Sequence, residues 1–178
     1  MFTDNTLSFN TNWATPQAIS TATNVDSTGI VDVTGAGSGN APAMIGGFPA
    51  KNTAMQNDYG SADGSNAMPW VYVTVTTLGT SGNTLTIRLE SAPDNGSYGQ
   101  GSYTILYQSA AIVASSMTVG LAYIFQVPPT PPGAALPRFY KLNYLASAAL
   151  TVSVLAGILL NPPFPTWGGK YPANYIVV

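Results

Sequence analysis

The sequence contains neither cysteine nor histidine among its 178 residues. It therefore forms no disulfide, carries no thiolate nucleophile and lacks the side chain that most often serves as a general base or metal ligand near neutral pH. Charge is also scarce: Asp, Glu, Lys and Arg make up 7% of the chain, where about 25% is usual. The five Lys and Arg residues are scattered, so we expect no nucleic-acid surface, which needs several cations together.

The remaining composition describes a surface of Ser, Thr, Asn, Gly and apolar groups. Such a surface repels neighbouring molecules only weakly and favours a protein that assembles, although an ordinary soluble domain with neutral polar decoration has the same composition. The length suits one domain over residues 1–178. The opening residues, MFTDNTLSFN, have neither the basic nor the apolar region of a signal peptide, so we expect synthesis in the cytoplasm without export.

An uncharged and largely apolar stretch runs over residues 142–160, and a helix of that length would cross a bilayer. From Leu150 onward its apolar residues alternate with a period of two, and the hydroxyls of Thr151 and Ser153 fall on one face. On a helix these two hydroxyls would point roughly 200° apart, so one of them would face lipid. The pattern therefore predicts a strand and no membrane span.

The residues before this strand alternate as well, from Phe139 to Tyr144. We therefore predict two strands joined near residues 145–149. In the second strand, Leu155 and Leu159 make the other face apolar towards its end. That face is expected to be covered late in the strand.

Further strand patterns recur at short intervals, and turn residues lie between them. The predicted strands occupy residues 28–34, 70–78, 84–90, 103–109 and 121–127. No window places apolar residues at helical spacing over three turns. The pattern predicts an all-β domain, a jelly roll or β-sandwich of about eight antiparallel strands.

Three segments do not fit a compact sandwich: an N-terminal arm over 1–17, a loop excursion over 35–69 and an extended C-terminal tail over 161–178. Pro and aromatic residues in the tail suit an arm that lies along another surface, although a tail folded back over its own sandwich fits equally well. We predict that the aromatic side chains of these segments contact neighbouring chains. They are Trp13, Phe48, Phe164, Trp167, Tyr171 and Tyr175.

The sequence matches known catalytic and ligand-binding motifs only weakly. The glycines of GAGSGN (35–40) are not followed by the helix that a dinucleotide-binding loop requires. The run NDYGSADGSN (57–66) fails the alternating ligand positions of a calcium loop. Glu90, the only Glu, shares a strand face with Arg88, which predicts an ion pair between them. The sequence leaves a glycosidase-like Asp pair open, but we expect no catalytic residue, no metal and no cofactor.

Several stretches, in order, resemble the capsid cement (decoration) proteins of tailed bacteriophages, which are small jelly-roll subunits on the head shell. They are LSFNTNWATPQAISTATNVDSTGIVDV (7–33), MPWVYVTVTTL (68–78), NTLTIRLESAPD (83–94), AAIVASSMTVGLAYIFQVPP (110–129) and PRFYKLNYLASAALTVSVLAGILL (137–160). The resemblance covers about three quarters of the chain and rests on pattern and order. The excursion over 35–69 and the tail over 161–178 depart from the family pattern, so their roles are not carried over.

The resemblance implies a structural virion protein that binds the outer surface of a phage capsid and stabilises contacts between major capsid subunits, without catalysis. Its expected partners are the major capsid protein and other copies of itself, because low charge and two apolar strand faces favour a dimer or a trimer. The alternative is a carbohydrate-binding jelly-roll module of a host-adsorption structure. Tryptophan and tyrosine are plentiful in the chain, and sugar rings stack on such side chains.

Overall fold

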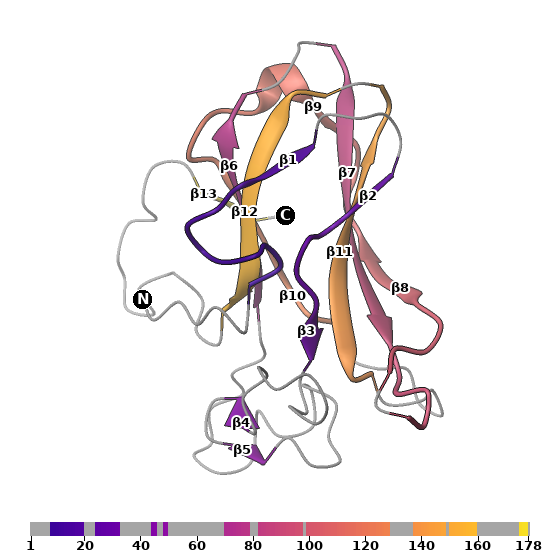
Figure 1. Ribbon diagram of the computed structural model, residues 1–178. Helices are drawn as coiled ribbons and strands as arrows, with labels where there is room; N and C mark the ends of the chain where they lie inside the picture. The colour runs from indigo at the N-terminus through magenta and orange to yellow at the C-terminus, as the bar shows by residue number, and fades with distance from the viewer. Residues whose placement is uncertain are drawn as a thin grey trace.

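The fold consists of two β-sheets packed face to face (Figure 1). The computed structural model describes residues 8–19, 24–32, 70–78, 82–97, 99–128, 137–148 and 150–159, and the backbone of strands at 44–45, 48–49 and 175–177. The first sheet contains, in order, β1 (Gln17–Ile19), β12 (Val152–Leu159), β6 (Trp70–Thr77), β10 (Ala122–Gln126) and β13 (Tyr175–Val177).

The second sheet is built around two long strands, β11 and β7. Its order is β2 (Val25–Asp26) and β3 (Val31–Asp32), both on β11 (Phe139–Ala146), then β7 (Thr84–Ala92), β8 (Thr104–Gln108) and β9 (Ile112–Val113), the last two on β7. A separate pair joins β4 (Met44–Ile45) to β5 (Phe48–Pro49), and a 3₁₀ turn, η2, spans Ala114–Ser116. The described residues contain no α-helix.

The strand order is that of a jelly roll. When β2 and β3 are counted as one interrupted strand, each sheet has four main strands, β1-β12-β6-β10 and β2/β3-β11-β7-β8, all paired antiparallel. Along the chain these strands alternate between the two sheets except at the β7–β8 hairpin. Eight strands wound in this way form a jelly roll. The predicted all-β class with about eight antiparallel strands is confirmed.

Alternation of apolar and polar residues places the core between the sheets. Val71, Val73 and Val75 of β6 are buried, while the residues between them are half-buried, and β7 repeats the pattern with Leu85 and Leu89. This follows from the period of two by which successive strand side chains point to opposite faces. The buried residues of both strands therefore point into the space between the two sheets.

The uncharged stretch over residues 142–160 forms parts of two strands that lie in different sheets. β11 ends at Ala146 and β12 begins at Val152, so the predicted break near 145–149 is confirmed. On the other face of β12, Leu155 is half-buried and Leu159 is 3% exposed, so that face is covered late in the strand as expected. Within the described residues no helix is long and apolar enough to cross a membrane.

The segment before β1 belongs to the sandwich over its described part. Phe9 is 0% exposed and connects both sheets: its N–H donates to the Ala156 carbonyl of β12 (2.9 Å), and its carbonyl accepts from the Gly29 N–H (2.7 Å). Ser8 forms a β-bridge with Gly157. Residues 8–10, which the sequence pattern assigned to an N-terminal arm, therefore fill the edge where the two sheets meet.

Of the strand predicted over residues 28–34, the described part (28–32) forms a strand at Val31–Asp32. After β2 the backbone keeps one more hydrogen bond to β11, from Ser27 N–H to the Leu142 carbonyl (2.7 Å). It then turns towards the N-terminal segment before β3 pairs with β11 again. At Gly29 a Cβ atom would lie 2.6 Å from the Asn10 carbonyl oxygen and 2.7 Å from that of Ser8. Only glycine allows two backbones to approach this closely.

Replacing Gly29 by alanine is expected to lower the free energy of unfolding by about 1–3 kcal/mol, because the added methyl group displaces backbone rather than a flexible side chain. Urea denaturation measures the loss. Thr28→Ala, at the exposed neighbouring position, is the control and should stay within about 0.5 kcal/mol of the wild type. Equal urea midpoints for Gly29→Ala and Thr28→Ala would contradict the close approach of the two backbones at Gly29.

Two of the predicted outer segments lie largely outside the described residues. Of the excursion over 35–69, β4 and β5 are described as a backbone pair. Of the tail over 161–178, β13 is described, and it pairs in parallel with β10, with Tyr175 opposite Ala122. The backbone at the end of the tail therefore extends the first sheet of its own chain.

Candidate functional site

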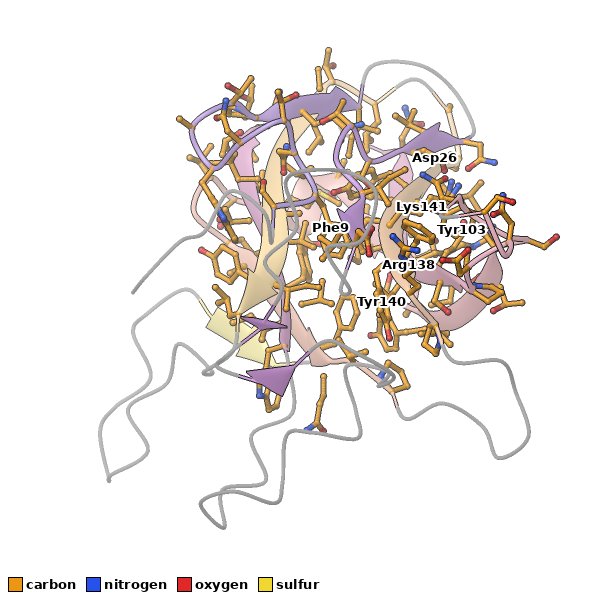
Figure 2. The ribbon with its side chains drawn as sticks, turned by 60° about the horizontal axis from the view of Figure 1, so that its bottom comes forward. Phe9, Asp26, Tyr103, Arg138, Tyr140 and Lys141 are labelled. Carbon is orange, nitrogen blue, oxygen red and sulfur yellow. The ribbon has the colours of Figure 1, made fainter. Side chains whose placement is uncertain are left out.

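The described charges gather around one strand of the second sheet, β11. Seven charged residues lie in the described part of the chain, and six of them form ion pairs around β11, which we call the β11 ion-pair cluster. Figure 2 shows Arg138 and Lys141 on the same side of the molecule as Asp26 and Tyr103. The cluster consists of Asp26, Asp32, Glu90, Asp94, Arg138 and Lys141.

Arg138 is the buried centre of the first half of the cluster, with 5% of its surface exposed. Its Nε and Nη2 donate to the two carboxylate oxygens of Asp32 at 3.0 and 2.8 Å, and its Nη1 donates to Asp94. The hydrogen bonds to Asp32 raise the pKa of the guanidinium above its usual value despite the opposing effect of burial. This bidentate geometry is the strongest that arginine offers a carboxylate, so Arg138 ties β3 and the loop after β7 to β11.

Lys141 is the centre of the second half. Its Nζ donates to Asp26 at 2.7 Å, lies 3.4 Å from Glu90 and sits over the ring of Tyr103 at 4.3 Å. Burial would raise the pKa of Asp26, but hydrogen bonds from Lys141 and Asn143 lower it overall. Burial, with a smaller effect of the nearby carboxylates, raises the pKa of Tyr103 to about 12. The phenol therefore remains neutral beside the ammonium group.

The ion pair expected between Arg88 and Glu90 is replaced by two other contacts. Glu90 faces Lys141, which lies directly opposite it in the register of β7 and β11, and Arg88 donates from Nε to Gln108 on β8 at 2.7 Å. Residues two apart on one strand face are farther from each other than residues directly opposite on adjacent strands. Arg88 and Glu90 therefore each contact a residue on an adjacent strand and do not pair with each other.

The ion pairs of the β11 cluster link strands of the second sheet to one another. Each of its two cations contacts two carboxylates, and these come from β2, β3, β7 and the loop after β7. An acid–base pair would need a group poised to exchange a proton with a substrate, whereas these carboxylates are held by cations. Within the described residues, no group of three or more carboxylates could hold a metal ion.

One end of the sandwich, in contrast, has no charge on its described residues. β6 ends next to the start of β12, and β7 starts next to the end of β11 (Figure 1, top). The described residues that follow or precede the strands there, 78, 82–83, 109–121, 147–148 and 150–151, carry no charge. We call this surface the neutral end. The strands of the first sheet carry no charge either.

The predicted contact residues fall in different places. Trp13 is half-buried in the turn before β1, while Phe48 and Tyr175 lie in β5 and β13, whose backbones alone are described. Phe164, Trp167 and Tyr171 lie outside the described residues. Contact of these six side chains with other chains stays a prediction.

Sequence reasoning missed the β11 ion-pair cluster. Its one signal is an Asp within the apolar run GIVDV, because a carboxylate on a buried strand requires a cation opposite it. Which cation that is depends on sheet order, and Asp32 and Arg138 lie 106 residues apart. Neither models of known protein families nor curated proteins match this chain.

Proposed function

We propose that this protein is a structural virion subunit, a capsid cement protein that binds the outside of a phage head and stabilises the contacts between major capsid subunits. The proposal draws on the family resemblance of the sequence and on the jelly-roll fold. The observation that carries it is the distribution of charge. The described ionic groups are used within the subunit, and the neutral end and the first sheet have no charge to repel a neighbour.

The mechanism needs no reacting group. A shell under internal pressure is limited by the contacts between its subunits, so a protein that binds only the assembled shell stabilises it by mass action. Each site contributes modestly, and the symmetry of the shell repeats the contact many times. The buried ion pairs of Arg138 keep the second sheet together while the neutral surfaces make contact.

Purified protein is expected to co-sediment with phage heads at micromolar concentration and to raise the temperature at which the heads rupture by several degrees. The measurement is sedimentation followed by thermal release of DNA. Unassembled major capsid protein is the control, since a cement protein favours the assembled shell. Absence of binding to heads at micromolar concentration would contradict the proposal, and saturable binding of an isolated monomer to a glycan array would favour the carbohydrate-binding alternative.

A further inference from the structure

The loop after β7 contains the one Asn-Gly pair of the sequence, Asn95–Gly96. In such a pair the glycine nitrogen can close a five-membered ring with the side-chain carbon of the asparagine, because glycine has no Cβ to obstruct the approach. Both residues are exposed. A Cβ atom built on Gly96 would meet no other atom within 4 Å, and the φ of +86° lies in a region that glycine adopts without strain. The pair therefore has space for ring closure.

Hydrogen bonds hold the Asn95 side chain in place. Its Oδ1 accepts from the Ser97 N–H at 2.8 Å and from the Gly99 N–H at 3.0 Å. Attack on the side-chain amide would place negative charge on this oxygen, and donors that are already in position stabilise such a charge. The backbone of Asn95 is held as well, since its N–H donates to the Gly99 carbonyl at 2.9 Å. The loop thus presents a polarised amide carbonyl beside Gly96.

The Gly96 N–H points at a carboxylate. It donates to Asp94 Oδ1 at 2.7 Å, and the other carboxylate oxygen of Asp94 accepts from Arg138. The Gly96 nitrogen must lose its proton as it attacks, and a carboxylate within hydrogen-bond reach can accept that proton as a general base. The ion pair with Arg138 keeps Asp94 in this position.

We propose that Asn95 is a modification site, at which the loop itself promotes deamidation of the side chain. The Gly96 nitrogen bonds to Asn95 Cγ, and its proton passes to Asp94. The bond between Cγ and Nδ2 then breaks, and ammonia leaves with that proton. Water adds to one of the two carbonyl groups of the resulting succinimide, and the ring opens to aspartate or isoaspartate. Water is the only other reactant.

The product alters one end of the β11 ion-pair cluster. The chain becomes one unit more negative than its net charge of −2, and the new carboxylate directly follows Asp94, which holds Arg138. Isoaspartate also adds a methylene group to the backbone of the loop that the hydrogen bond between Asn95 and Gly99 closes. This inference concerns the chain itself and does not depend on the cement function.

The test compares Gly99→Ala with Ser97→Ala. A Cβ atom at Gly99 would lie 2.5 Å from Asn95 Nδ2, so alanine displaces the amide from its donors. Ser97→Ala is the matched control, because it removes an exposed hydroxyl and keeps both the Asn-Gly pair and the backbone N–H that donates to Asn95. Peptide mass spectrometry during incubation at mildly alkaline pH measures the conversion of Asn95 and the isoaspartate formed. Circular dichroism checks the fold, and the wild type in urea gives the rate of the unfolded chain.

The folded wild type is expected to convert Asn95 at least as fast as the unfolded chain at the same pH. Ser97→Ala should convert within about twofold of the wild type, and Gly99→Ala at least about fivefold more slowly, because the stabilisation of charge on Oδ1 is lost. Slower conversion in the folded wild type than in urea would overturn the inference, since the fold would then protect Asn95. Equal rates for the two variants would overturn it as well, because the hydrogen bonds to Oδ1 would then have no effect.

Discussion

Arg138→Met is expected to lower the free energy of unfolding by about 3–5 kcal/mol, the largest effect of any single substitution among the described charged residues. The side chain is 5% exposed and holds Asp32, which is also 5% exposed. Removing the guanidinium leaves that carboxylate buried without its cation, and the cost of an unpaired buried charge exceeds the net benefit of the pair. Urea denaturation at neutral pH measures the loss.

Two further variants make this prediction specific. Arg88→Met removes a cation that donates to Gln108 at the protein surface and should cost less than about 1 kcal/mol. Adding Asp32→Asn to Arg138→Met removes the orphaned charge and should recover part of the loss, which a double-mutant cycle quantifies. If Arg138→Met and Arg88→Met unfold at the same urea concentration, Arg138 is not the centre that the structure describes.

Asn10→Ala is expected to cost about 2–4 kcal/mol, because the Asn10 amide completes the hydrogen bonding of a strand. Its Nδ2 donates to the Val154 carbonyl at 2.9 Å, and its Oδ1 accepts from the Ala156 N–H at 2.7 Å. Asn10 is 2% exposed, so water does not replace the lost bonds. Truncation leaves a buried donor and a buried acceptor of β12 without partners.

The measurement combines thermal unfolding with hydrogen exchange of the peptide that contains β12. Loss of protection at the Ala156 amide is specific to the missing side-chain acceptor, since a general loss of stability would speed exchange throughout the core. Asn12→Ala is the matched control: Asn12 Oδ1 accepts only from the exposed Ala14 N–H in a local turn. Unchanged protection at Ala156 would contradict the role assigned to Asn10.

The local pattern of the sequence predicted much of the fold because successive side chains of a strand point to opposite faces of the sheet. Burial alternates along most of β6 and β7 and along the first half of β12, and it is less regular in β11. Their inward faces and the break inside the uncharged stretch were therefore predictable. Short strands such as β2 and β3 contain too few residues to display a period, and their extent is set by Gly29 and its close approach to the N-terminal segment.

Contacts across long sequence separations were decided by the tertiary structure. Asn10 looks like a residue of a polar arm until sheet order places it beside β12, 144 residues away. Lys141 and Glu90 become partners only because β11 lies next to β7 in register.

The sequence by itself determined a cysteine-free all-β chain with few charged residues, because composition and strand period are local properties. The tertiary structure alone decided that six of the seven charged residues in the described part of the chain form ion pairs around β11. The reason is that a jelly roll brings together segments that are distant in the chain, and the topology of the two sheets selects which segments those are.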